Sequence, residues 1–363
     1  MSVLLQTLRR SDWLLTGSVV LLTVFGLVSL YSSSIGREDF SNFQKQGVFL
    51  AVGLILMLVF ASLDWRLLKN NPYLIIALYV LGAAALIGLF FFAPETRGTR
   101  GWYRFGGLAF DPVELMKLVL VILMAKYLSL RHIALYKLRE IALSGAYFAL
   151  PVALIFLQPN LGSALVLMAL WMAVMLVSGI KIRHFLVIVT VAVLVFSLGW
   201  TVVLKDYQKA RIMSFIEPEL DPLGMGWSQL QSKIAIGNGG IFGQGFGNGT
   251  QTQHLFLSEP QTDFIFAAIG EEFGLMGILA LFLLYFTLIF RIIRIALAAE
   301  SNFPRFFAVG LAALIVFQVF INVGMNLGLL PIIGLPLPLV SYGGSALIFS
   351  YIGLGILQSI KAH

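Results

Sequence analysis

Long apolar stretches separated by short polar segments repeat along almost the whole chain. A bilayer core of about 30 Å requires about 20 mainly apolar residues in a spanning helix. This length criterion predicts about ten spans and an all-α bundle of transmembrane helices in one domain, residues 1–363. The predicted spans lie near 14–33, 46–63, 73–93, 113–130, 141–158, 162–179, 184–204, 264–290, 307–328 and 340–360.

Composition supports an integral membrane protein. Hydrophobic residues make up 59% and charged residues 11% of the chain, whereas a soluble domain is about 25% charged. Cysteine is absent, which excludes disulfides, Cys-based metal sites and a Cys nucleophile. The formal net charge of +7 is not accompanied by a nucleic-acid motif, and in a membrane protein it more often reflects basic cytoplasmic loops.

The distribution of basic residues predicts the orientation. Lys and Arg are more numerous in the loops on the side of the two termini, so we expect both termini in the cytoplasm. The first apolar run lacks a small-residue cleavage site and is expected to be a retained span. Two long external loops, near 93–112 and 205–262, are the expected location of the functional site because loops of that length are usually functional.

Two charged residues, Glu114 and Lys117, lie inside the apolar pattern of the fourth predicted span. A spacing of three places them about 60° apart around a helix and close enough to pair. An ionisable side chain within a span is costly and usually faces the bundle interior or a water-filled cavity. One interpretation is a structural ion pair that fixes helix packing. The other is a cavity in which the lysine holds a pyrophosphate and the glutamate orients the lysine.

The stretch EPQTDFIFAAIGEEFG, residues 259–274, brings three acids to the start of the eighth predicted span. Asp263 is either a helix N-cap, a common role before an apolar run, or a carboxylate with a chemical role. On a regular helix, Glu271 and Glu272 would lie about 80° and 180° around from Asp263. All three cannot then face one metal ion. We therefore expect Asp263 to carry chemistry, and Glu271 and Glu272 to be structural or second-tier residues.

Two further segments are rich in residues that interrupt helices. The glycine-rich segment 237–250 has no preceding strand and no GK[ST], so a nucleotide site is disfavoured and a flexible or tightly turning loop is predicted. In LLPIIGLPLPLVSYGGSAL, Pro336 and Pro338 predict a kink or a re-entrant segment buried in protein. Ser341 and Gly343 follow, and small residues there permit close helix contact. We expect these four residues to be structural.

Several strings together resemble the SEDS family of bacterial cell-wall polymerases, which includes RodA and FtsW. The resemblance runs from about 97 to 348 in family order and is greatest to the RodA branch. The sequence departs from the family pattern at Asp111, where Gln is usual, and at Gln261, where His is usual. The matching strings are GWYRFGGLAFDPVELMKL, QPNLGSA, DYQKARIMSFIEPELDPLGMGWSQLQSKIAIGNGGIFGQGFGNGTQ, EPQTDFIFAAIGEEFG and NVGMNLGLLPIIGLPLPLVSYGGSALI.

The resemblance implies a glycosyltransferase that polymerises lipid II into glycan strands on the outer face of the bacterial cytoplasmic membrane, for cell elongation and rod shape. It implies that the family's aspartate is Asp263. The substrate-binding residues that it implies are Glu114, Lys117, Arg100, Trp102, Arg211, Gln231 and Ser232.

The chemistry of this reaction fits those residue types. A sugar hydroxyl displaces an α-linked polyprenyl pyrophosphate and forms a β-1,4 link, which is an inverting substitution. A carboxylate that takes the hydroxyl proton typically contributes about 10² to 10⁴ in rate, and Asp263 fits that role. The leaving pyrophosphate needs positive charge, for which Lys117, Arg211 and Arg100 are candidates. No cofactor is certain; a divalent cation, Mg²⁺ or Mn²⁺, is the alternative, with Asp263 as its ligand.

Two other classes of function stay open from the sequence: a flippase or transporter for a lipid-linked precursor, and a non-catalytic scaffold for a penicillin-binding protein. A transporter predicts polar positions through both leaflets and an internal repeat, whereas the polar residues here cluster toward the predicted outer face. The resemblance implies several partners and no nucleic acid. These partners are lipid II, a class B penicillin-binding protein transpeptidase, other membrane proteins of the elongation machinery, and membrane lipid.

Overall fold

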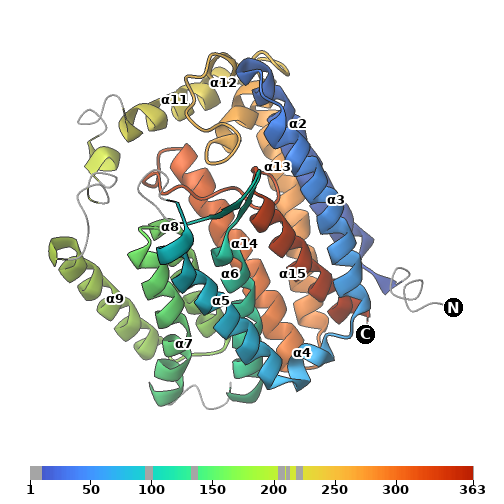
Figure 1. Ribbon diagram of the computed structural model, residues 1–363, viewed down its shortest axis with the longest axis vertical. Helices are drawn as coiled ribbons and strands as arrows, with labels where there is room; N and C mark the ends of the chain where they lie inside the picture. The colour runs from blue at the N-terminus through green and yellow to red at the C-terminus, as the bar shows by residue number, and fades with distance from the viewer. Residues whose placement is uncertain are drawn as a thin grey trace.

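A computed structural model describes residues 10–94, 101–131, 138–202, 209, 213–217 and 224–362. Long helices dominate these ranges and run back and forth between two ends of the molecule (Figure 1). They match the ten predicted spans, and the prediction of an all-α membrane bundle is confirmed. The long helices are α2 (Trp13–Arg37), α3 (Ser41–Ser62), α5 (Pro72–Phe92), α6 (Pro112–Arg131), α7 (Leu138–Leu157), α8 (Leu161–Val177), α9 (Ile182–Val202), α13 (Ile265–Ala298), α14 (Asn302–Asn326) and α15 (Gly344–Ala362).

Seven of these helices are long and apolar enough, by length and composition, to cross a membrane. The others are α6, which contains Glu114 and Lys117, and the shorter apolar helices α8 and the first part of α9. A proline lies in the turn between two of these helices, as the sequence predicts. Between α7 and α8, Pro159 has a φ of 33° and Asn160 caps α8 by accepting from the N–H of Ser163, so the QPN turn separates two helices.

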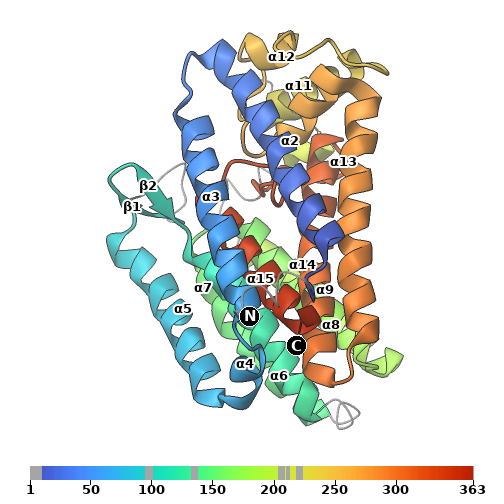
Figure 2. The same ribbon diagram turned by 90° about the vertical axis from the view of Figure 1, so that its right-hand side faces the viewer.

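The two ends of the bundle differ. One end holds the start of α2, the short helix α4 (Arg66–Asn70), the α13–α14 connection and the end of α15. The opposite end holds α11 (Met225–Asn238), α12 (Thr250–Gln253) and a β-hairpin, which Figure 2 shows away from the chain ends. We refer to these as the terminal end and the loop end of the bundle.

Glycines allow helices to approach closely at the centre of the bundle. A Cβ added at Gly26 of α2 would lie 2.2 Å from the carbonyl oxygen of Val340, and one added at Gly355 of α15 would lie 2.7 Å from that of Met57 in α3. Small residues at such contacts are the usual basis of helix association in membranes, because lipid provides no hydrophobic driving force between helices. The segment before α15 is thereby held between α2 and α3.

The two loop regions contain regular structure that the sequence analysis missed. Residues 103–110 form an antiparallel hairpin of β1 (Tyr103–Phe105) and β2 (Leu108–Phe110), with Gly106 at a φ of 60° in the turn. The loop near 205–262 was predicted to be irregular, but it includes α11 and α12. Each of these elements has 14 residues or fewer, so it presents too little periodicity to stand out beside strong transmembrane signals.

The glycine-rich loop supplies the backbone hydrogen bonds that a break in α13 leaves unmade. Gly274 has φ 62° and ψ −159°, which interrupts the helix. The N–H groups of Leu275 and Met276 donate instead to the carbonyls of Gly240 and Ile241, at 2.9 and 3.1 Å. The carbonyls of Glu271 and Glu272 accept from the N–H groups of residues 244 and 245, at 2.9 and 3.0 Å. Four bonds to the loop thus satisfy the backbone groups that a regular helix would have paired with each other.

This arrangement predicts a large difference between two glycines of the loop region. Gly243 has a φ of 82°, and an added Cβ would lie 2.1 Å from the carbonyl oxygen of Glu272, whereas a Cβ at the helical Gly237 meets nothing within 4 Å. Gly243→Ala should cost at least about 1–2 kcal/mol from the left-handed backbone alone. Gly237→Ala should stabilise by up to about 1 kcal/mol. Thermal melting of the purified protein in detergent measures both, and equal melting temperatures would contradict the account.

Candidate active site

The backbone around Asp263 is fixed by side chains from distant elements. Asn322 and Asn326 of α14 donate to the carbonyl oxygen of Asp263 at 3.0 and 2.9 Å. Ser341 donates its hydroxyl to the carbonyl of Thr262 at 2.6 Å. The Asp263 side chain itself is partly buried. Its carboxylate therefore projects from a backbone that has little freedom to move.

Asp263 is not the N-cap of α13. The N-cap residue is Phe264, which makes no side-chain cap bond. The side-chain oxygen of Asn326 accepts from the N–H of Ala267 in the first turn, at 3.2 Å. A residue of another helix thus performs the capping that the sequence pattern suggested for Asp263. The angles expected for Glu271 and Glu272 also do not apply, because Asp263 precedes the helix.

Glu114 and Lys117 form the ion pair that their spacing predicts. Lys117 Nζ lies 2.7 Å from Glu114 Oε1, and the two side chains are 1% and 11% exposed. Glu114 lines a small cavity of about 20 Å³ between α6, α14 and α15, together with Gln318, Ser350 and apolar side chains. The carboxylate therefore reaches the cavity, and the ammonium group is covered.

A third ionisable residue, Asp111, lies beside this pair at the start of α6. Its Oδ1 accepts from the N–H of Val113 at 2.8 Å, and its own N–H donates to Ser345 Oγ of α15 at 2.9 Å. Burial, and next the negative charge of Glu114, raise the pKa of the Asp111 carboxyl to about 7; Lys117 acts in the opposite direction. Asp111 is thus poised to change charge near neutral pH.

The segment 327–343 and the first turn of α15 link the surroundings of Asp263 to Asp111. Ser341 contacts Thr262, and Ser345, four residues later, contacts Asp111. An added Cβ at Gly334 would lie 3.5 Å from Asp263 Oδ2, so the absence of a side chain at Gly334 leaves space beside the carboxylate. Asp263 and Asp111 therefore both lie beside the stretch from Ser341 to Ser345 at the loop end of the bundle.

This segment is non-helical, as the prolines predict, and its polar backbone groups are satisfied by side chains. The N–H of Leu337 donates to Ser341 Oγ, and Asn322 donates to the carbonyl of Leu335, at 2.8 and 2.7 Å. Tyr285 donates to the carbonyl of Pro338, and Gln46 donates to that of Ser341 at 3.1 Å. Irregular backbone at membrane depth requires such partners because water is absent there.

Glu271 and Glu272 face other elements and not Asp263. Glu271 is fully buried and accepts from the N–H groups of Gln251 and Thr252, at 2.6 and 3.0 Å, so it caps α12. Glu272 accepts from Ser32 of α2 and from the side chain of Gln253, the latter at 3.2 Å. Both carboxylates join the glycine-rich loop region to the bundle.

The remaining predicted site residues that the structure describes lie beside the hairpin, in α11 and in the segment 327–343. Trp102 is 37% exposed beside the hairpin. Gln231 and Ser232 of α11 are buried, and Ser232 donates to the carbonyl of Asn326 at 2.8 Å, which joins α11 to α14. Arg100 and Arg211 lie outside the described residues. Pro336 and Gly343 lie in the segment 327–343, where the N–H of Gly343 donates to Gln46 at 3.3 Å.

The sequence analysis gave no role to Asn322, Asn326, Gln261 or Gln46. All four are buried and hydrogen-bonded around the segment 261–263 or the segment before α15. The sequence contains one pattern that points to two of them: Asn322 and Asn326 are spaced i, i+4 in an apolar span and so share a face.

A preformed protein cage for a metal ion is not supported. The described residues contain no group of three or more His, Cys, Asp or Glu side chains that could hold one.

Comparisons with known proteins agree over nearly the whole chain. A model of the cell cycle proteins FtsW, RodA and SpoVE matches residues 12–363. The peptidoglycan glycosyltransferase MrdB of Escherichia coli K12 is 37% identical over 343 residues, which cover 94% of this chain and 91% of MrdB. The stage V sporulation protein E of Bacillus subtilis is 34% identical over 363 residues, with 97% of both chains covered.

Two solved structures are similar in fold. One describes the structural coordination of polymerization and crosslinking by a peptidoglycan synthase complex. Its TM-score is 0.83 and its sequence identity is 34%, and the match covers 97% of each chain. The other is the crystal structure of the rod shape determining protein RodA of Thermus thermophilus. It has a TM-score of 0.71 and 31% identity over 97% of this chain and 96% of that one.

The raised pKa of Asp111 predicts a pH-dependent effect of Asp111→Asn. A carboxyl that ionises less readily in the folded state destabilises the fold progressively as pH rises from about 4 to about 7. Asn removes this penalty, so the variant should raise the melting temperature more at pH about 8 than at pH about 4.5. The control is Asp39→Asn, because a hydrogen bond from the Ser41 N–H lowers the pKa of Asp39, and it should not stabilise at either pH. The same gain for Asp111→Asn at both pH values would contradict the assignment.

Proposed function

The chain belongs to the FtsW, RodA and SpoVE family of cell cycle proteins and is a peptidoglycan glycosyltransferase, and on this premise we propose that it polymerises lipid II with Asp263 as general base. The observation that carries the proposal is the position of Asp263. Its backbone is held rigidly beside the segment that leads into α15, and Ser345 in the first turn of α15 bonds to Asp111, which interacts electrostatically with Glu114 and Lys117. A carboxylate and a buried group of charges thus flank one region at the loop end of a membrane bundle.

Asp263 would act on the acceptor. Its carboxylate takes the proton of an acceptor sugar hydroxyl while that oxygen attacks the anomeric carbon of the donor. The bond between this carbon and the pyrophosphate oxygen breaks, and polyprenyl pyrophosphate leaves with the bonding electron pair. The product is a β link because attack and departure take place on opposite faces. A fixed backbone supports this role, since the base must be held within hydrogen-bond reach of the hydroxyl.

The buried pair would serve the leaving group indirectly. Lys117 is covered and bound to Glu114, so its charge reaches a pyrophosphate through the local potential or after the cavity beside Glu114 opens. The family resemblance makes Arg100 and Arg211, which lie outside the described residues, the further candidates for neutralising the pyrophosphate. A resident metal is not needed for any step that these residues perform.

The chain is a multi-pass membrane protein, and we assign the loop end to the outer face of the bacterial cytoplasmic membrane and both termini to the cytoplasm. The excess of basic residues on the terminal side supports this orientation. We further propose that the protein works in cell elongation with a class B penicillin-binding protein, which would crosslink the strands. The likeness to a peptidoglycan synthase complex, at a TM-score of 0.83, supports an assembly of this kind.

The central experiment is polymerisation of labelled lipid II by the purified full chain with its penicillin-binding protein partner. Asp263→Ala should lower the rate by about 10² to 10⁴, the usual contribution of a general base. The matched control is Asp39→Asn, which changes an exposed acid in the α2–α3 connection at the same end of the bundle and should retain the wild-type rate.

An Asp263→Ala protein that polymerises as fast as wild type would exclude the proposed base. If the wild-type protein makes no glycan with its partner present but moves lipid across vesicles, the chain is a transporter. If it does neither, and the partner alone makes glycan, the chain is a scaffold.

A second experiment separates a structural from a functional role of the buried ion pair. Lys117→Met or Glu114→Gln alone leaves one buried charge unpaired and should destabilise the fold by about 3–5 kcal/mol. The double variant Glu114→Gln/Lys117→Met removes both charges and should recover most of the melting temperature. We expect polymerisation to stay at least tenfold below wild type in the refolded double variant. Recovery of full activity together with stability would show that the pair is only structural.

A further inference from the structure

A second cavity lies at the terminal end of the bundle, away from Asp263. Its volume is about 500 Å³, within the range of small-molecule sites. It is lined by residues just before α2, from α4, from the end of α13, from the start of α14 and from the end of α15. Asp263 and Asp111 precede the loop-end starts of α13 and α6. The cavity is thus separate from the proposed active site.

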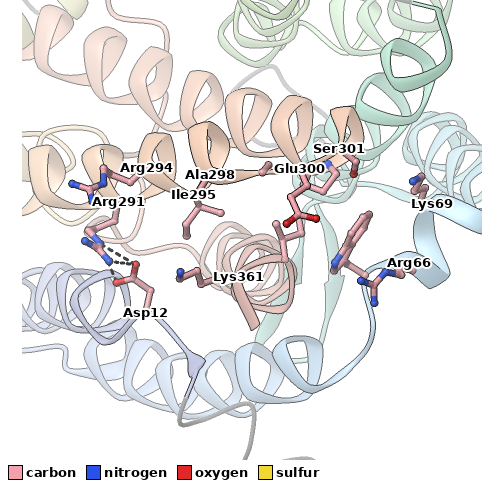
Figure 3. A pocket seen from close by; sticks show the side chains of 14 residues that line it. Asp12, Arg66, Lys69, Arg291, Arg294, Ile295, Ala298, Glu300, Ser301 and Lys361 are labelled. Carbon is pink, nitrogen blue, oxygen red and sulfur yellow. Dashed lines mark hydrogen bonds and ion pairs between the residues drawn. The ribbon is translucent and has the colours of Figure 1, made fainter. Parts of the chain in front are cut away.

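The lining of this cavity is strongly basic. Five basic side chains face two acidic ones. Figure 3 shows Lys361 between the Asp12–Arg291 ion pair on one side and Glu300 on the other. Asp12 accepts from Arg291 Nε at 2.9 Å, so the charge of Arg291 is already matched. The basic residues of the lining are Arg66, Lys69, Arg291, Arg294 and Lys361.

Four basic side chains therefore remain against Glu300 within the lining. A further acid, Asp64, pairs with Arg66 at 3.4 Å in an exposed ion pair, and such pairs contribute little. Even with Asp64 included, positive charge predominates. An anion that enters the cavity would experience a net favourable potential.

An unsatisfied donor lies in the same wall. Trp65 lines the cavity and is 8% exposed, and its Nε1–H has no hydrogen-bond partner among the described residues. Buried indole N–H groups usually have an acceptor. The ring is held in place because it stacks on Phe303 at 5.7 Å and its backbone N–H donates to Ser359 at 3.1 Å. Arg66 and Lys69 lie over the same ring, at 5.5 and 5.8 Å from its centroid.

We propose that this cavity binds a phosphate group. Its charge is balanced by Arg66, Lys69 and Lys361, and a phosphate oxygen accepts from the buried Trp65 indole once the flexible Arg66 and Lys69 side chains that lie over the ring move onto the phosphate. The group is presented either by the headgroup of an anionic phospholipid or by a free phosphate. The position at the ends of membrane-spanning helices favours the lipid, since basic pockets between transmembrane helices at a membrane surface are suited to phosphate headgroups. This inference does not depend on the proposed polymerase activity.

Native mass spectrometry of the full chain tests the proposal. The chain is released from nanodiscs that contain equal amounts of phosphatidylglycerol and phosphatidylcholine with the same acyl chains. Wild type should retain phosphatidylglycerol selectively, and Arg66→Gln/Lys69→Gln/Lys361→Gln should lose at least about tenfold of this selectivity. Lys181→Gln/Arg183→Gln, which changes exposed basic residues at the same end but outside the cavity, is the control and should behave as wild type.

A second variant tests the indole. Trp65→Phe keeps an aromatic ring on Phe303 but removes the N–H, and it should weaken phosphate-group binding by about tenfold. Trp171→Phe, whose N–H donates to Ser144 outside the cavity at 3.2 Å, should have no effect on binding. Equal binding by Trp65→Phe and wild type, with both proteins folded, would overturn the role of Trp65.

Inorganic phosphate distinguishes the two sources. If it displaces bound phosphatidylglycerol or stabilises the wild type but not the triple variant in phosphatidylcholine nanodiscs, the site accepts free phosphate. If only phosphatidylglycerol distinguishes the two proteins, the source is the lipid. If neither ligand distinguishes them, the proposal is wrong. Binding of an acidic peptide such as polyglutamate in place of both ligands would also overturn it, in favour of a protein-docking surface.

Discussion

Asn322 and Asn326 donate hydrogen bonds to the carbonyl of Asp263, and Ser341 donates one to the carbonyl of Thr262. These bonds hold the backbone from which the Asp263 carboxylate projects, just before the start of α13. An unsatisfied carbonyl in a water-free bundle costs several kcal/mol, so breaking these hydrogen bonds would strongly destabilise the fold. Because Asn326 also caps α13 and accepts from Ser232, one side chain couples α11, α13 and α14. The candidate base is consequently part of a rigid network.

The same constraint explains why the glycines and prolines of the outer segments are needed. The segment 327–343 is non-helical and passes between α2, α3 and α14, where its carbonyls are satisfied by Asn322, Tyr285 and Gln46. Gly274 interrupts α13 so that the glycine-rich loop pairs with it, and Glu271 then caps α12. Glu271, Glu272 and Lys117 are thus buried with partners at the loop end, and a cavity lined mainly by basic side chains lies at the terminal end.

The sequence predicted the spans and the ion pair because both depend on local spacing. Apolar runs of about 20 residues determine the spans, and a separation of three places Glu114 beside Lys117. It did not predict the cap of α13, which comes from Asn326, a residue 59 positions away from Ala267. It left open whether Lys117 is covered or faces a cavity, and it did not indicate that Ser232 is buried, since burial of a polar residue depends on which helices pack around it. The short elements 103–110 and α12 lack enough periodicity to be detected.

A structure with bound substrate would show whether Asp263 and the buried Glu114–Lys117 pair act on the acceptor and the leaving group of one reaction. The measurement is a cryo-EM map of the full chain, with Asp263→Asn to prevent turnover, bound to lipid II and a glycan acceptor. We expect the acceptor hydroxyl within hydrogen-bond distance of residue 263, and the donor pyrophosphate on the side of α13 where Asp111, Glu114 and Lys117 lie. Substrate bound away from residue 263, or a pyrophosphate on the opposite side of α13, would contradict it.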